Sequence, residues 1–257
     1  MSLVNAPLPL SALNVAADFR LDAGGRDSDT HSRSLRDHHQ ALWEKPLPSG
    51  DHFSLTPIDR GRIFRLLHVS SHNRFSLSSD QLITALRKRC RDFYSQFKDA
   101  ENQAFHRRAQ TLGGRIIFPS QQVDGKYTIN QARGTHPLIR DRFDLTLECI
   151  RRYYAAEDSP LSSTLERYSH FFNLFQDFQG YVDFFLLQDI AQEGEVQFFL
   201  PFDGFRRPAL PRDMGEYVQF RDSQMNFVRV RNQRILHYCE QTTAPSRGGI
   251  ALRGRQC

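Results

Sequence analysis

"IFRLLHVSSHNRFSLSS", residues 63–79, contains two short apolar runs separated by a polar break. Runs of this length that are rich in β-branched and aromatic residues are typical of strands. Asn73 lies in the break and tolerates the left-handed backbone of a tight turn. The segment therefore predicts a hairpin of strands 63–71 and 74–79. We predict further short strands at residues 52–56, 113–119 and 123–129.

Helical periodicity surrounds this hairpin. In residues 137–155, apolar side chains recur at steps of three or four while charged ones recur on another face, which predicts an amphipathic helix. Further helices are predicted at 30–45, at 80–110 in one or two pieces behind Ser79 or Asp80 as cap, at 160–178 and at 223–238. Residues 181–190 predict a strand or a continued helix, and 196–202 a strand after the turn 192–195.

These elements predict an α+β fold, in which a small antiparallel or mixed sheet packs against several amphipathic helices. No internal repeat or Pro-rich linker divides the chain, so we expect a single globular domain at residues 27–240. Residues 1–26 are rich in Gly, Ala and Pro, and residues 241–257 carry three Arg and no acid. We expect both to be flexible tails, the second of them basic.

Composition excludes several classes of protein. Hydrophobic residues make up 39% of the 257, which is enough for a packed core without a disulfide framework. The four cysteines are widely separated, with no pair at zinc-binding spacing. The chain has no signal-peptide pattern and no apolar run of membrane-spanning length. We therefore expect a cytoplasmic protein without a membrane segment.

The net charge of +5 is unevenly distributed. Residues 60–115 hold twelve Arg or Lys against four Asp or Glu, and "RKRCRDFYSQFK" (87–98) interleaves basic with aromatic residues. Such a segment could bind the phosphates of RNA or DNA and stack bases on exposed rings. The alternative is a solvated basic face, because Phe93 and Phe97 lie one turn apart and fit a core stripe.

Several ordered motifs resemble a bacterial family of uncharacterised proteins, a domain of unknown function. They are "RDSDTHSRSLRDHHQALWEKPLPSG" (26–50), "LSSD" (77–80), "GGRIIFP" (113–119), "TINQARG" (128–134), "DRFDLTLECIRRYY" (141–154), "SPLSSTLERYSHFFNLFQDFQGYVDFFLLQD" (159–189) and "FFLPF" (198–202). The resemblance covers roughly residues 26–236 and implies no activity.

The motif "TINQARG" suggests an anion site. A strand would deliver Asn130 and Arg133 to a loop, where Gly134 lets the backbone approach a phosphate at the start of the next helix. In the alternative interpretation, Arg133 pairs with Asp141 or Asp144 and only holds the loop. The substrate-binding candidates are Asn130, Arg133, Arg142, Lys45, Ser70 and Ser78. Glu44 is a candidate ion-pair partner for Lys45.

Catalytic candidates are fewer. His39 and His68 could exchange protons near neutral pH, although a histidine on an apolar stripe is more often part of the core. The order of His68, Ser70 and Ser78 resembles that of NAD-dependent ADP-ribosyltransferases, which implies a later acid, Glu148 or Glu195. An ion-pair ladder accounts for Asp141, Asp144 and Glu148, so we assign no metal ligand.

Our first hypothesis is a phosphate-recognising pocket directed to nucleotides or nucleic acid. The alternatives are an ADP-ribosyltransferase-like enzyme that uses NAD and a non-catalytic protein-interaction domain. The sequence does not decide whether the protein is an enzyme, and the cofactor and the oligomeric state stay unknown.

Overall fold

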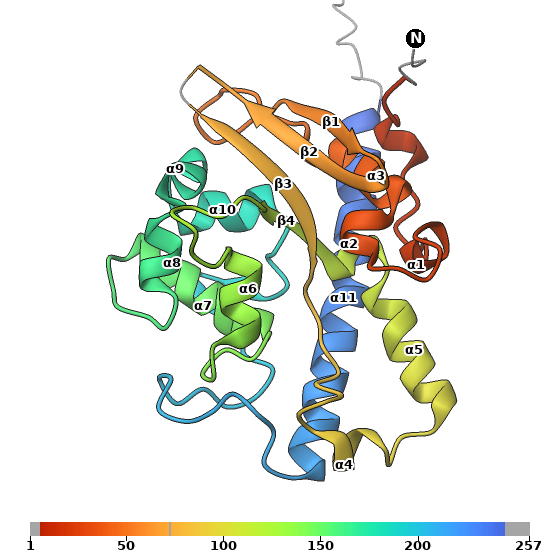
Figure 1. The fold of residues 1–257 in the computed structure, drawn as a ribbon, viewed down its shortest axis with the longest axis vertical. Coiled ribbons are helices and arrows are strands. Elements are labelled where there is room, and N and C mark those ends of the chain that lie inside the picture. Colours follow the sequence, from red (N-terminus) through yellow and green to blue (C-terminus); the bar gives the residue numbers. More distant parts are fainter. Residues whose placement is uncertain (1–5, 72, 245–257) are drawn as a thin grey trace, which may run out of the picture.

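The computed structural model describes residues 6–71 and 73–244. Its centre is a four-stranded antiparallel sheet in the order β1-β2-β3-β4 (Figure 1). The strands are β1 (Leu55–Arg60), β2 (Ile63–Val69), β3 (Arg74–Gln81) and β4 (Arg115–Pro119). The predicted hairpin is therefore confirmed as β2–β3, and the α+β class and the single domain are confirmed as well. A separate small hairpin consists of β5 (Ala191–Gln192) and β6 (Glu195–Val196).

Helices surround the sheet and are distributed along the whole described chain. They are α1 (Phe19–Asp22), α2 (Ser28–His31), α3 (Arg33–Trp43), α4 (Arg91–Tyr94), α5 (Asp99–Ala109), α6 (Ile129–Thr135), α7 (Phe143–Tyr154), α8 (Ser162–Glu166), α9 (Ser169–Phe172), α10 (Phe178–Phe184) and α11 (Met214–Thr243). Short 3-10 turns are η1 (Leu10–Ala12), η2 (Leu112–Gly114) and η3 (Asn173–Phe175). Figure 1 shows α6 to α10 on one side of β3 and β4, and α1, α2, α3 and α5 on the other.

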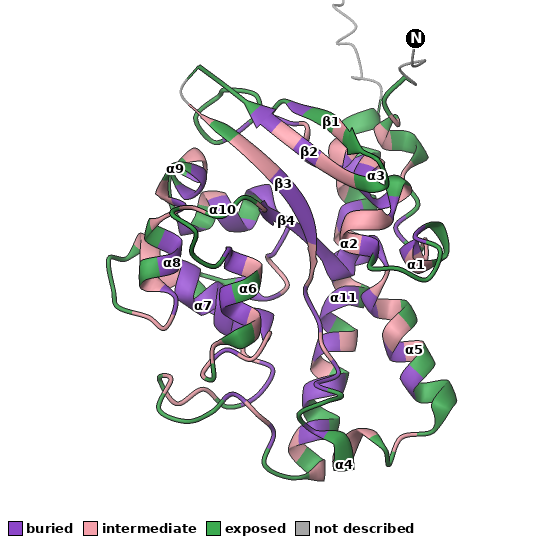
Figure 2. Ribbon diagram, in the orientation of Figure 1, coloured by how far each residue is buried: buried purple, intermediate pink, exposed green. Residues whose placement is uncertain are grey.

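The sheet has one covered face and one partly open face. Helix α3 begins where the Ser32 hydroxyl accepts from the backbone N–H of Leu35 at 3.0 Å, and it buries Leu35, Leu42 and Trp43. Figure 2 shows that burial increases from the hairpin end of β3 toward the middle of the strand. The hairpin end thus leaves one face of β1, β2 and β3 accessible.

Two predicted elements near β3 are wrong. Residues 79 and 80 do not cap a long helix, because Ser79 and Asp80 belong to β3 and pair with β4. A loop, α4 and α5 follow instead, and Leu86 in that loop has a left-handed φ of 48°. The predicted strand 123–129 is also absent, since the Thr128 side chain accepts from the N–H of Gln131 and starts α6.

The second half of the chain is more helical than predicted. Residues 181–184 follow the helical alternative as the end of α10, whereas 185–190 form turns. The predicted helix 160–178 is divided into α8, α9 and η3. The φ of 68° at Gln176 separates η3 from α10. The turn 192–195 is confirmed, but only Glu195–Val196 of the expected following strand pairs, and it pairs with β5.

At both ends, the domain in the structure extends beyond its predicted boundaries. Residues 6–26 are not a loose tail throughout, because Val15 and Phe19 are buried in the core and α1 lies within the segment. Helix α11 continues to Thr243, beyond the expected end at residue 240. Residues 1–5 and 245–257, which include most of the predicted basic tail, lie outside the described residues. None of the helices in the described ranges is long and apolar enough to serve as a membrane span.

Arg231 of α11 joins three parts of the fold. Its side chain is fully buried, and its guanidinium donates to four backbone carbonyls. Nη1 donates to Gly113 (2.9 Å) and Arg115 (2.7 Å), Nη2 to Phe185 (2.9 Å) and Nε to Leu186 (3.2 Å). The four acceptors belong to η2, β4 and the segment after α10, so one side chain fixes α11 against all three.

We predict that Arg231→Met lowers the free energy of unfolding by more than about 3 kcal/mol, because four buried carbonyls lose their donor. Urea denaturation followed by circular dichroism measures the change. Arg229→Met is the matched control on the same helix, since Arg229 is exposed, and we expect it to cost no more than about 0.5 kcal/mol. Equal effects of the two substitutions would contradict a special role for Arg231.

Candidate functional site

The accessible face of the sheet carries the candidate site. Cross-strand partners in an antiparallel sheet point to the same face. Ile58 of β1 pairs with Arg65 of β2, and Arg60 pairs with Ile63. Leu67 of β2 pairs with Ser76 of β3 on that same face. The alternation of the strands therefore gathers arginine and aliphatic side chains on one surface.

These side chains line a groove of about 500 Å³, which we call the arginine groove. Its lining residues are Ile58, Arg60, Ile63, Arg65, Leu67, Arg74, Ser76 and Gln121. No acidic residue is among them, and no ion pair between described residues involves any of the three arginines. Asp59, the acid of β1, points to the opposite face and pairs with Arg36. The groove therefore carries three uncompensated positive charges.

Arg65 is the most enclosed arginine of the groove. It is partly buried, and its Nε is shielded from solvent without a hydrogen-bond partner in the described structure. A shielded donor without an acceptor costs free energy, which an anionic oxygen in the groove would recover. Sequence reasoning included Arg60, Arg65 and Arg74 in the basic segment 60–115 but named none of them. Only the strand register brings them together.

The contacts of Arg133 are those of a residue that holds the fold together rather than of one that binds a ligand. Its side chain is fully buried, and Nη1 donates to the Asp80 carboxylate (2.5 Å) and to the carbonyl of Gln81 (3.1 Å). Nε donates to the Thr146 hydroxyl (3.1 Å), and Nη2 to the carbonyl of Asp141 (3.0 Å). The expected strand and loop are absent, because "TINQARG" forms α6. The loop-holding alternative describes this geometry, with Asp80 as the main partner and Asp141 at 3.4 Å as the second.

His39 belongs to a second buried network, on the covered face of the sheet. The Trp43 indole N–H donates to His39 Nδ1 (3.0 Å), so the ring proton is on Nε2, which faces the Ser79 hydroxyl at 3.1 Å. Beside it, Arg115 pairs with Asp29 of α2. Burial, and then the positive charge of Arg115, hold the pKa of His39 well below 6.5. The network fastens α2 and α3 to the sheet.

The remaining catalytic candidates have separate surroundings. His68 stacks on Phe53 with ring centroids 4.5 Å apart and donates from Nδ1 to the carbonyl of Ser54 at 3.0 Å. Ser78 points to the opposite face of the sheet from His68, because the register gives them opposite parity. Burial lowers the pKa of His68.

Glu148 of α7 is buried and forms ion pairs with Arg151 (2.9 Å) and Arg152 (2.7 Å). The charged side of this helix is therefore largely buried rather than exposed to solvent. The other acid, Glu195, is exposed in the β5–β6 hairpin. Ser70 is exposed after β2, and the Oδ1 of Asn130 is buried without a described partner. The candidate residues for a transferase do not share one cleft.

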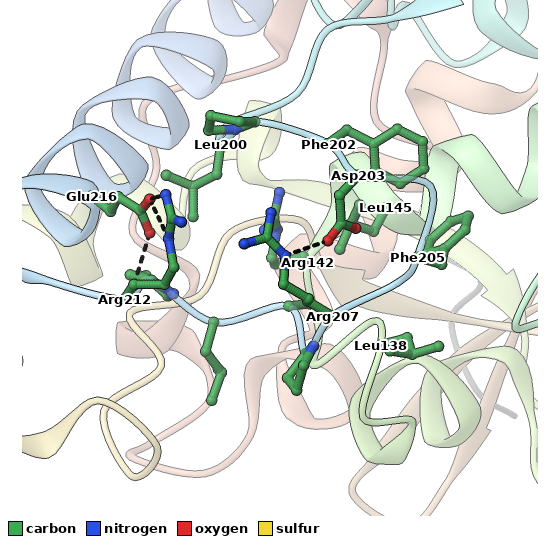
Figure 3. A pocket seen from close by; sticks show the side chains of 15 residues that line it. Leu138, Arg142, Leu145, Leu200, Phe202, Asp203, Phe205, Arg207, Arg212 and Glu216 are labelled. Atoms are coloured by element: carbon green, nitrogen blue, oxygen red, sulfur yellow. Dashed lines mark hydrogen bonds and ion pairs between the residues drawn. The ribbon is translucent and has the colours of Figure 1, made fainter.

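Arg142 lines a different pocket, of about 320 Å³, at the start of α7 (Figure 3). It forms a two-point ion pair with the fully buried Asp144 (3.2 and 2.5 Å), which also accepts from the N–H of Phe199 at 3.0 Å. Two further pairs line the pocket, Arg207–Asp203 and Arg212–Glu216. Each guanidinium here has its own carboxylate, so the pocket is close to neutral.

The basic stretch 87–98 does not present stacking aromatics in the way that nucleic-acid binding needs. Phe93 and Phe97 are partly buried and pack on Tyr217, with ring centroids 5.7 and 5.8 Å apart. Arg87 lies over the Tyr94 ring at 5.6 Å, and Arg87 itself is exposed. This is the arrangement of the core-stripe alternative, with charges on a solvated surface.

The fold and site thus define an α+β protein with an arginine-lined groove on an open sheet face. The chain belongs to a family of unknown function, DUF6994, whose model matches residues 13–235. This finding confirms the resemblance that the motifs indicated. No curated protein and no solved structure matches the chain.

We predict that Arg133→Met lowers the free energy of unfolding by about 3 kcal/mol or more, because it leaves the buried Asp80 carboxylate unpaired. The double variant Arg133→Met, Asp80→Asn should cost less than the sum of the two single changes. Chemical denaturation of all four proteins provides the cycle. Additive losses would show that the ion pair does not couple the two residues.

We predict a pH-dependent contribution from His39. Its folded pKa lies below 6.5, so the unfolded chain binds more protons in acid and stability falls as the pH drops below 6.5. Between pH 7.5 and 5.5, His39→Gln should therefore remove part of the acid-induced loss, on the order of 1 kcal/mol. The exposed His237→Gln serves as control. Parallel stability–pH curves for wild type and His39→Gln would contradict the assignment.

Proposed function

We propose that the protein binds single-stranded nucleic acid through phosphate contacts in the arginine groove. The observation that carries the proposal is the set of three arginines on adjacent strands without a lining acid or an ion pair. Guanidinium groups bind phosphate by paired hydrogen bonds and stay charged at all physiological pH values. The pocket at Arg142 gives weaker support for anion binding than the arginine groove does, because each of its arginines is already paired with a carboxylate.

The spacing of the arginines favours a polymer over a single phosphate. Arg60 stands opposite Ile63 and Arg74 stands opposite Val69, six residues further along β2. At 3.3 Å per residue these positions are about 20 Å apart, and Arg65 lies between them. A single phosphate would have to draw both outer arginines toward it in extended conformations, whereas successive phosphates of a nucleic-acid strand can meet them along the groove.

The aliphatic floor argues for recognition of the backbone. Ile58, Ile63 and Leu67 lie between the arginines, and Ile63 is 40% exposed. They offer apolar contact to sugars and base faces, but none of the described residues that line the groove has an aromatic ring for base stacking. A binding module of this kind needs no catalytic residue. The proposal keeps nucleic acid as the ligand of segment 60–115, but it assigns the binding to Arg60, Arg65 and Arg74 rather than to residues 87–98.

We predict that replacing Arg60, Arg65 and Arg74 together by Gln weakens binding to a single-stranded oligonucleotide at least about tenfold at moderate salt. The slope of log affinity against log salt should fall by about 2, because three phosphate contacts are lost at about 0.7 each. Fluorescence anisotropy with labelled RNA and DNA oligonucleotides measures both quantities.

The matched control is the triple Gln variant of Arg87, Lys88 and Arg91, which removes the same charge from exposed positions of the basic segment. We expect it to bind nearly as well as wild type. Equal losses in the two triple variants would indicate a general charge effect. A wild-type chain that binds neither RNA nor DNA at low salt would refute the proposal.

A further inference from the structure

Lys45 occupies an aromatic cage directly after α3. Its side chain is mostly buried, with 9% of the residue exposed. Nζ lies 4.6 Å from the ring centroid of Tyr238, 4.7 Å from that of Phe184 and 5.1 Å from that of Trp43. The other three lysines of the chain, Lys88, Lys98 and Lys126, are all exposed. Lys45 is therefore the one amine of this set held inside the fold.

The expected partner of Lys45 does not neutralise it. Glu44 faces the backbone N–H of Leu55 (3.5 Å) and the side-chain amide of Gln40 (3.4 Å) instead. Asp183, which lies nearby on α10, accepts from Gln179 and Gln188. No ion pair between described residues involves Lys45. A buried ammonium without a carboxylate partner is unfavourable.

The charged groups around Lys45 act in opposite directions. Burial, followed by the guanidinium of Arg231 on α11, lowers the pKa of Lys45 to about 7. Cys239 on α11 and Asp183 on α10 act weakly in the other direction. The three rings also favour the charged form. The balance leaves a substantial share of the amine neutral, and thus nucleophilic, at neutral pH.

A small molecule can reach this amine. Lys45 lines a pocket of about 410 Å³ together with Pro46, Leu47, Pro48, Gly180, Asp183, Phe184 and Tyr238. The walls are mainly apolar, which suits an uncharged organic ligand better than an anion. The single carboxylate of the lining would repel an anionic ligand.

We propose that Lys45 is a covalent binding site for small, uncharged aldehydes or ketones. The Nζ lone pair attacks the carbonyl carbon to give a carbinolamine. The hydroxyl then leaves as water, and a C=N bond replaces the C=O bond. The amine loses two protons in all, and these leave with the carbonyl oxygen as water, so the step needs no oxidant or reductant. Hydrolysis reverses it. The site is separate from the arginine groove and does not depend on nucleic-acid binding.

The test is competitive labelling of the intact wild-type chain. Propionaldehyde with cyanoborohydride at pH 7 converts imines to stable alkylamines, and peptide mass spectrometry measures the rate at each lysine. We expect Lys45 to react at least about tenfold faster than Lys88, Lys98 and Lys126, because exposed lysines are almost fully protonated at this pH. The advantage should disappear in urea.

A dextran-linked aldehyde is the size control, and should label the exposed lysines but not Lys45. The rate at Lys45 should level off above pH 8, whereas the rates at the exposed lysines should continue to rise. Labelling of Lys45 no faster than that of the other lysines would overturn the proposal. So would equal labelling by the dextran reagent, because the pocket would then select nothing.

Discussion

The buried guanidinium of Arg231 is the contact on which the arrangement of the fold depends. It donates to carbonyls at Gly113 and Arg115 on one side and at Phe185 and Leu186 on the other. Burial lowers the pKa of Arg231 to about 9, which still leaves the group charged at neutral pH. A lysine could not replace it, because an ammonium has three donors and no planar fork. Helix α11 is thereby fixed to the sheet on its covered side, and the opposite face of β1 to β3 stays open for a ligand.

Two populations of arginine among the described residues differ in their partners. Arg115, Arg133, Arg142 and Arg231 are buried and are engaged by carboxylates, hydroxyls or carbonyls. The arginines of the groove have no ion-pair partner among the described residues. Burial of a guanidinium is costly unless most of its donors are satisfied. Arginine in the first population therefore explains stability, whereas the second population is available to act on a ligand.

The sequence predicted those elements whose pattern is local. The hairpin 63–79 has strand periodicity and a turn residue, and α3 has Ser32 as a cap before its apolar stripe. The strand predicted at 123–129 is wrong because Thr128 and Gln131 form a capping box, a local helix signal that starts α6. The periodicity of residues 137–155 sorts the charges of α7 to one face, but it does not show that Asp144 meets Arg142 inside the core. The arginine groove could not be predicted from the sequence either, because it depends on the register between three strands rather than on the spacing of residues along one strand.

The chemistry of the groove limits what it can recognise. Among the described residues, Ser76 and Gln121 are the neutral polar ones that line the groove, and the Ser76 hydroxyl already accepts from that of Ser120 at 3.2 Å. Reading a base edge needs paired donors and acceptors at fixed positions, whereas phosphate contacts carry no sequence information. A surface built from three guanidiniums and aliphatic side chains should therefore bind a nucleic-acid strand by its sugar-phosphate backbone, with little preference for base sequence. Any selectivity for particular sequences would have to come from residues outside the groove.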